Sequence, residues 1–281
     1  MDYQTIAYST VGPVAVITLN RPEVRNAQNE LLKEELDAAL HRADAEEAIR
    51  VIILKGAGSN FSAGHDMKQF PKDPTAFGAA DPRKWFEGDT EKFRQFVYKV
   101  LRLFLNVHYT KKPTIAQVHG HVIAGGWVLA SMCDLIIASD DTTIADPVVR
   151  MGSAGVEAIV EPWDVGPRRA KELLWTGDSI SADEAWRLGM VNRVVPAAKL
   201  DEETMRLAQK IALSPPGTVQ ATKRSINHAL DLMGWRASHE FHTELWVANN
   251  LSDEHKRLHA ERESMGLREF IRRRDQPFQK R

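Results

Sequence analysis

The chain has little cysteine and no excess charge of either sign. Its single cysteine, Cys133, excludes an intrachain disulfide and a metal cage built from thiolates. Lysine and arginine total 37 and aspartate and glutamate total 38, so the net charge is −1 at pH 7. This balance argues against a dedicated nucleic-acid-binding protein, which would carry a basic excess. We therefore expect neither a nucleic-acid partner nor a bound metal.

Long hydrophobic runs are also scarce. Residues 113–133 contain no Asp, Glu, Lys or Arg, and about 20 apolar residues suffice to cross a bilayer. Pro113, Gln117 and the pair Gly125–Gly126 interrupt the stretch, so it is better explained as a buried strand, a turn and a buried helix. The start, MDYQTIAYST, has no basic segment followed by an apolar one. We expect a cytoplasmic protein without a membrane partner.

The apolar pattern predicts an α/β fold. Short β-branched or apolar runs typical of strands alternate with helically spaced segments, an order that favours parallel pairing. After about residue 195 the pattern is helical, with breaks at 215–217 and near Gly234. We predict an α/β core over residues 1–199 and a helical region over 200–281. The predicted core strands are 14–19, 51–54, 113–118, 135–138 and 191–195, and the predicted core helices include 28–42 and 125–132.

Two glycine turns follow predicted strands. Residues 61–66 (FSAGHD) come after the strand at 51–54, and residues 124–127 (AGGW) open the helix after the strand at 113–118. Glycine lets a ligand approach the main chain, and a helix N-terminus has free N–H groups. Two such turns from adjacent strands could direct two N–H groups at one oxygen, as in an oxyanion hole. Taken alone, each turn is more often a purely structural feature.

These turns belong to a longer series of motifs. In this order and spacing, the series resembles the crotonase superfamily, the enoyl-CoA hydratases and isomerases, over essentially the whole chain. The matching segments are Asn20-Arg-Pro22 with Asn26-Ala27, residues 61–66, residues 112–120, Ala124-Gly-Gly126 through Cys133-Asp134, residues 174–177 with 181–185, residues 189–192, and Phe270 through Arg274.

The resemblance implies a spiral of ββα turns, a C-terminal helical region that trimerises, and a homotrimer or a dimer of trimers. It also implies an acyl-CoA substrate, with coenzyme A entering as part of that substrate and no permanently bound cofactor. The oxyanion donors would be the backbone N–H groups of His65 and Gly125. For residues 272–274, a solvated helix end is the alternative to a contact with CoA. The implied contacts with coenzyme A are Arg25, Ala27, Ala63, Asp66, Lys68 and Arg273.

The sequence departs from the family at the acid–base residues. The two positions where hydratases carry glutamates hold Val128 and Val148, and valine neither accepts nor donates a proton. Glu157 is the candidate replacement, because a carboxylate among Val156, Ala158 and their apolar neighbours should have a raised pKa. The alternative is a surface glutamate on the first turn of a helix. Glu161, Asp164 and Asp146 are lesser candidates, and Trp127 and Trp163 either narrow an acyl pocket or belong to the core.

The function predicted from the sequence is that of an enoyl-CoA hydratase/isomerase-family enzyme. It would act on an acyl-CoA thioester by stabilising an enolate in an oxyanion hole, without the standard glutamates. The alternative is a non-catalytic acyl-CoA-binding paralogue, and a third possibility is a structural subunit of a larger complex. Two histidine pairs, His255 with His259 and His239 with His242, fit solvated helix faces better than metal sites.

Overall fold

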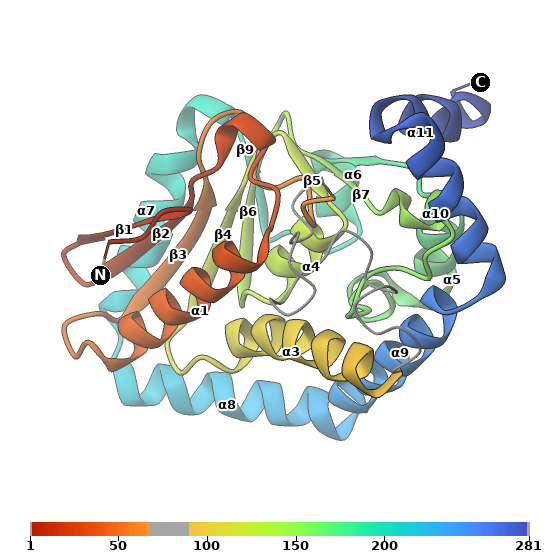
Figure 1. Cartoon of the computed structure of the whole chain (residues 1–281). Coiled ribbons are helices and arrows are strands. Elements are labelled where there is room, and N and C mark those ends of the chain that lie inside the picture. Colours follow the sequence, from red (N-terminus) through yellow and green to blue (C-terminus); the bar gives the residue numbers. More distant parts are fainter. Residues whose placement is uncertain (1, 68–89, 280–281) are drawn as a thin grey trace.

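The computed structural model describes residues 2–67 and 90–279, which form two β-sheets surrounded by helices (Figure 1). The six-stranded sheet has the order β1-β2-β3-β4-β6-β9, antiparallel between β1 and β2 and parallel from β2 onward. A smaller sheet has the order β5-β7-β8. The strands are β1 (Ile6–Val11), β2 (Val14–Leu19), β3 (Val51–Gly56), β4 (Thr114–Val118), β5 (His121–Ile123), β6 (Leu135–Ser139), β7 (Thr143–Ala145), β8 (Ile180–Ser181) and β9 (Arg193–Val195).

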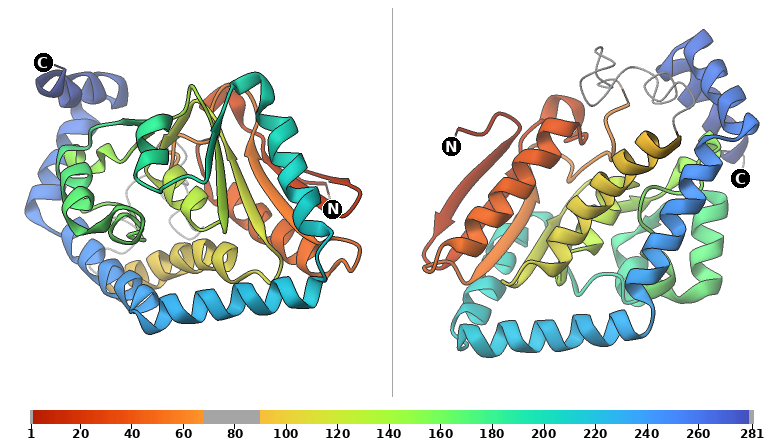
Figure 2. Two further views of the ribbon diagram at one scale, coloured as in Figure 1. Left: turned by 180° about the vertical axis from the view of Figure 1, so that it is seen from behind. Right: turned by 60° about the horizontal axis from the view of Figure 1, so that its bottom comes forward.

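Helices cover both faces of the large sheet. Helices α1 and α3 lie on one side of the sheet and α7 lies on the other. Helix α8 runs along the edge of the molecule toward α9–α11 (Figure 2). The helices are α1 (Glu30–Ala45), α3 (Thr90–Tyr109), α4 (Gly125–Ser131), α5 (Glu161–Thr176), α6 (Ala182–Arg187), α7 (Leu200–Ala212), α8 (Pro216–Leu232), α9 (Trp235–Asn250), α10 (Asp253–Met265) and α11 (Leu267–Asp275). The short 3-10 helices are η1 (Pro22–Val24), η2 (Pro147–Met151), η3 (Ala197–Lys199) and η4 (Gln276–Phe278).

The side-chain alternation of β3 explains this layering. Ile52 and Leu54 belong to the larger core cluster with α1, α3 and α4, whereas Val51 and Ile53 belong to a second cluster that includes residues of α7. Successive strand residues point to opposite faces, so a strand covered on both faces is apolar throughout. Helix α7 begins at Leu200 and packs on the sheet as part of the core layers.

Glycine, serine and proline mark the ends of several elements, and the two predicted breaks at 215–217 and near Gly234 are confirmed. Gly177 ends α5 in the left-handed conformation, with φ of 65°. The Ser181 side chain accepts a hydrogen bond from the N–H of Glu184 and begins α6. The chain breaks between α7 and α8 at Pro215, and Gly234 precedes α9. Residues 113–133 form β4, a turn, β5 and α4, and no helix in the described residues is long and apolar enough to cross a membrane.

Candidate active site

The first loop of the site is held by buried polar side chains near the start of the chain. The amide of Asn26 donates to the carbonyl oxygens of Ala57 and Asn60, each at 2.8 Å. The Arg21 guanidinium donates to the carbonyl of Ala27 and forms a buried ion pair with Asp66 at 2.8 Å. A buried charge is stable only when it is paired and hydrogen-bonded, and this pair meets both conditions. The segment 62–66 is therefore fixed against residues 26–28.

The second loop requires glycine at position 126 and has little room for a side chain at position 125. A Cβ on Gly126 would lie 2.5 Å from the backbone oxygen of Ser62, and a Cβ on Gly125 would lie 3.0 Å from Cε1 of His65. Ala124, which precedes α4, has φ of 48° and ψ of −113°, a combination that is strained for a residue with a side chain. A Cβ on Gly64 would lie 3.2 Å from the backbone nitrogen of Gly125, so the two glycine turns meet.

Two backbone N–H groups lie at this junction without an acceptor among the described residues. The backbone N–H of Gln28 donates to the carbonyl oxygen of Gly64, and the backbone carbonyl oxygen of Gln28 accepts from the N–H of Asp66. The N–H of His65, which lies between these two bonds, takes no part in this β-bridge. Gly125 is the first residue of α4, where N–H groups have no acceptor within the helix. The Gln28 side chain donates to the carbonyl of Gly125 at 3.0 Å and ties the two loops together. An oxyanion hole needs two free N–H donors on neighbouring turns, and these two groups meet that requirement.

The junction opens into a cavity of about 720 Å³. This volume is in the range of pockets that take small organic ligands, about 300–1,000 Å³. Five predicted site residues line it: Ala63, His65 and Asp66 from the first loop, and Arg25 and Ala27 from the segment between η1 and α1. Glu157 and Val148 line it from the segment after β7, and α10 and α11 line its far side. The fold thus brings together loops that are far apart in the sequence: His65 and Glu157 are separated by 92 residues.

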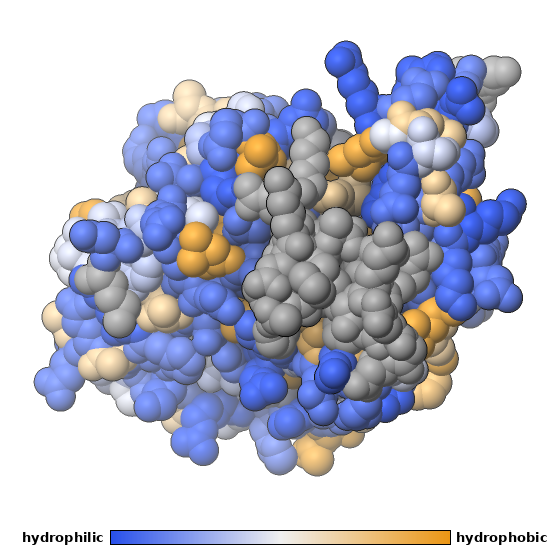
Figure 3. Space-filling model, in the orientation of Figure 1, coloured by the Kyte–Doolittle hydropathy of each residue, from blue (hydrophilic) through white to orange (hydrophobic). Residues whose placement is uncertain are grey.

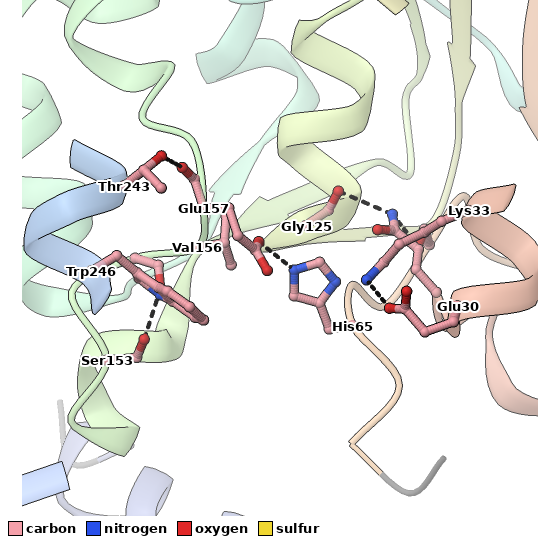
Figure 4. Close-up of polar contacts among 12 residues, drawn as sticks. Glu30, Lys33, His65, Gly125, Ser153, Val156, Glu157, Thr243 and Trp246 are labelled. Carbon is pink, nitrogen blue, oxygen red and sulfur yellow. Dashed lines mark hydrogen bonds and ion pairs between the residues drawn. The ribbon is translucent and has the colours of Figure 1, made fainter. Parts of the chain in front are cut away.

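Glu157 does not have the raised pKa that its apolar neighbours predicted. It lies in a buried turn before α5, so the alternative of a helix-surface position is also wrong. His65 Nε2 lies 2.7 Å from Glu157 Oε2 (Figure 4). Burial alone would raise the pKa of Glu157, but the charge and hydrogen bond of His65, together with the charge of Lys33, hold it at about 2. Glu157 is therefore ionised at neutral pH.

Helix α9 holds the backbone of the segment that carries Glu157. Thr243 Oγ1 donates to the carbonyl of Glu157 at 2.8 Å, and Trp246 Nε1 donates to the carbonyl of Gly155 at 2.8 Å. His242 Nε2 lies 2.8 Å from the carbonyl oxygen of Val156, and His239 Nδ1 accepts from the N–H of Ile159. These contacts correct the prediction that His239 and His242 are solvated, because both are buried.

His255 and His259 also differ from the prediction. Both line the cavity from α10, and His259 is 7% exposed. His255 Nδ1 is 3.2 Å from the carbonyl oxygen of Gly152, and His259 Nε2 is 2.5 Å from an Arg262 nitrogen. Their spacing of four residues does place them on one face, but that face packs over the cavity.

The remaining acid–base candidates lie away from the cavity lining. Asp146, Glu161 and Asp164 are not among the residues that line it, and burial raises their pKa values to about 6, 8 and 7. Val128 is buried inside α4, whereas Val148 faces the cavity. Trp127 belongs to the core cluster and Trp163 packs against it, which favours the core alternative for both.

The predicted coenzyme A contacts Lys68 and Arg273 are not among the described residues that line the cavity. Lys68 lies outside the described residues. Arg273 is 60% exposed at its side chain, pairs with Glu269 and is not among the cavity-lining residues, whereas its neighbour Arg274 does line the cavity. The residues that the sequence did not single out are Gln28 and the face of α9. Gln28 stands among the polar residues Asn26, Asn29 and Glu30, so the sequence carries no signal for it. The helical spacing of His239, His242 and Trp246 was the signal for the face of α9.

Comparisons with known proteins agree with this architecture. The family model described as enoyl-CoA hydratase/isomerase matches residues 10–281. The chain belongs to the enoyl-CoA hydratase/isomerase family. It is 41% identical over 256 residues to the protein named "Putative enoyl-CoA hydratase EchA13" from Mycobacterium tuberculosis, covering 84% of this chain and 78% of that protein. It is 31% identical over 235 residues to the short-chain-enoyl-CoA hydratase of Clostridium acetobutylicum, covering 82% and 84%.

The fold is shared with solved members of this enoyl-CoA hydratase/isomerase family. The crystal structure of an enoyl-CoA hydratase/isomerase from Xanthobacter autotrophicus Py2 superposes with a TM-score of 0.87 at 34% identity, covering 98% of this chain and 99% of that chain. The predicted crotonase-like α/β fold with a helical C-terminal region is thereby confirmed, and so is membership of an enzyme superfamily.

Proposed function

We propose that this enzyme acts on an acyl-CoA thioester whose carbonyl oxygen accepts hydrogen bonds from the N–H groups of His65 and Gly125. The observation that carries the proposal is the meeting of the Gly64 and Gly125 turns at the cavity, with both N–H groups unengaged within the described chain. Donors fixed by the backbone stabilise the negative charge of an enolate without reorganising during the reaction. Family members carry names of hydratases and isomerases, which supports a thioester substrate.

The coenzyme A moiety would lie against basic residues of the cavity lining. Arg25, Arg262 and Arg274 line the cavity, together with His255 and His259. Guanidinium groups form charge-assisted hydrogen bonds with phosphate oxygens, so these arginines suit the phosphates of CoA. The acyl chain would then extend along the apolar wall that includes Val148, Val156 and Ile123. Coenzyme A would enter and leave with each turnover rather than stay bound.

Water addition would be slow in this site. Val148 faces the cavity and Val128 is sealed in α4, so neither position offers a group that activates water. Apolar walls also disfavour an ordered water. The chemistry best supported is formation of an enolate and return of a proton to carbon.

A non-catalytic acyl-CoA-binding paralogue is the alternative, because Val128 and Val148 remove the paired carboxylates. A screen of short and medium acyl-CoAs separates the two, with binding measured by calorimetry and turnover by mass spectrometry in parallel. Conversion of any thioester at a rate above the no-enzyme control supports the enzyme. Binding of several thioesters with no conversion of any supports the alternative.

A homotrimer or a dimer of trimers is the assembly that we propose. Leu232, Met233 and Phe241 are 77%, 68% and 67% exposed, and Leu245 is 51% exposed. Apolar groups appear over the α8–α9 region at the lower right of the space-filling view (Figure 3). Exposed apolar patches of this kind are typical of subunit contacts. Light scattering at micromolar protein should give at least three times the chain mass, and a monomeric mass would contradict the proposal.

A further inference from the structure

The oxyanion junction contains two buried polar atoms without partners in the described chain. They are Nδ1 of His65 and Oε1 of Gln28. Each lies 3.3 Å from the point where a Cβ on Gly125 would be. Buried polar groups are satisfied in the great majority of cases, so an unsatisfied pair in a ligand cavity marks a place where a polar group or a proton arrives.

The contact with Glu157 determines which nitrogen of His65 is free. An ionised carboxylate only accepts hydrogen bonds, so Nε2 carries the proton that is donated to Glu157 Oε2 at 2.7 Å. In the neutral imidazole, Nδ1 then has the lone pair. The same ring edge faces Gly125, whose N–H is the second oxyanion donor. This Nδ1 atom is four covalent bonds from the backbone nitrogen of His65, which is the first of the two proposed oxyanion donors.

We propose that the His65 imidazole, oriented by Glu157, moves the proton at the carbon next to the thioester carbonyl. One residue would thus supply an oxyanion donor from its backbone and the base from its side chain. Glu157 is then a positioning residue that fixes the tautomer and stabilises the imidazolium, in place of the proton donor that the sequence suggested. This inference rests on the proposed acyl-CoA function.

The step needs no co-reactant. Nδ1 takes the α proton, the C–H electron pair forms the carbon–carbon double bond of the enolate, and the carbonyl π pair moves to the oxygen held by His65 N–H and Gly125 N–H. Both the new Nδ1–H of His65 and Oε1 of Gln28 lie next to Gly125, each 3.3 Å from the point where a Cβ on Gly125 would be. Reversal returns the proton to the α carbon, or to the γ carbon when the substrate has a neighbouring double bond. The net reaction is proton exchange or a shift of the double bond.

Other charged groups surround the pair. Lys33 of α1 acts on Glu157 and is itself bonded to Glu30 at 3.1 Å (Figure 4). Asp146, before η2, interacts with His65, and His242 of α9 interacts with Glu157. Lys33 and an imidazolium at His65 both favour the ionised carboxylate, so the transferable proton stays on the imidazole rather than on Glu157.

The test is deuterium exchange at the α carbon of 3-butenoyl-CoA in D₂O, followed by proton NMR, with butyryl-CoA binding measured by calorimetry. His65→Gln keeps both backbone donors and should retain butyryl-CoA binding while exchange falls by roughly 10²–10⁴-fold. Glu157→Gln should lower exchange as well. Because the two side chains act as a unit, the double variant should be no slower than the slower single variant. His41→Gln removes an exposed histidine that lies 3.7 Å from Asp37, and it is the matched control.

A single variant that leaves a buried charge unpaired could be lost to misfolding. The double variant, which puts an uncharged amide at each position, covers that case. The acidic limb of the wild-type pH–exchange profile should also disappear in His65→Gln, which a merely structural role would not cause. His65→Gln with the wild-type rate and profile would overturn the inference, and so would wild-type protein that binds butyryl-CoA without exchanging 3-butenoyl-CoA. Failure to bind any acyl-CoA would instead overturn the proposed function.

Discussion

Substitution of Gly125 by valine tests the proposed second oxyanion donor. The Cβ would lie 3.0 Å from Cε1 and 3.3 Å from Nδ1 of His65, and 3.3 Å from Oε1 of Gln28. These neighbours are side-chain atoms that can shift by a few tenths of an ångström, so the fold should survive. The added methyl groups occupy the space beside the N–H and keep the thioester oxygen away from it. Loss of one oxyanion donor costs about 10²–10³ in rate.

The assay compares turnover of the best thioester from the acyl-CoA screen in three glycine variants. Gly217→Val is the matched control, because a Cβ on Gly217, in the first turn of α8, meets nothing within 4 Å. Gly126→Ala is a contrast, since its Cβ would lie 2.5 Å from the Ser62 backbone oxygen and should reduce stability. Full activity of Gly125→Val, with native thermal unfolding, would refute the oxyanion assignment.

Three further predictions concern water, phosphate and protons. Hydration of crotonyl-CoA, followed by loss of enoyl absorbance, should be far below that of a two-glutamate hydratase, because each missing acid–base group costs about 10²–10⁴; a comparable turnover number would contradict this. By calorimetry, Arg274→Ala should weaken CoA binding roughly tenfold, and added salt should reduce this difference. Wild-type affinity in Arg274→Ala would exclude a phosphate contact at Arg274. Wild-type affinity in Arg273→Ala would exclude Arg273, the residue chosen from the sequence. Burial, with Asp146 and Asp164 nearby, raises the pKa of Glu161 to about 8, so its cost to folding grows as pH rises from about 4.5 to 8. Urea unfolding should therefore show that Glu161→Gln stabilises more at pH 8 than at pH 5.5, and an equal effect would place that pKa elsewhere.

The sequence was sufficient for the α/β class, for strand β2 and for the two turns. Strand β2 was predicted with the bounds that it has, since a β-branched run between turn residues has few alternative conformations. The turns at Gly64 and Gly125 were predicted because glycine marks a backbone conformation or a close approach, and both requirements are local.

The sequence could not predict which side chains meet across the site. The pKa of Glu157 was expected to be raised because only its apolar sequence neighbours were considered, but His65, 92 residues away, reverses the shift. In the same way, His239 and His242 looked solvated because the segment that they hold is distant in sequence. Such contacts depend on how the loops and α9 pack, which periodicity along one helix does not encode.

Thioester polarisation at the junction of the two glycine turns is the central claim, and infrared spectroscopy tests it most directly. Butyryl-CoA labelled with carbon-13 at the thioester carbonyl gives a stretching band that can be followed free and bound. Two hydrogen bonds from the N–H groups of His65 and Gly125 weaken the carbonyl double bond. The bound band should therefore move to lower frequency in the wild-type protein and move back toward its free position in Gly125→Val. A bound band at the frequency of free butyryl-CoA in the wild-type protein would contradict the account.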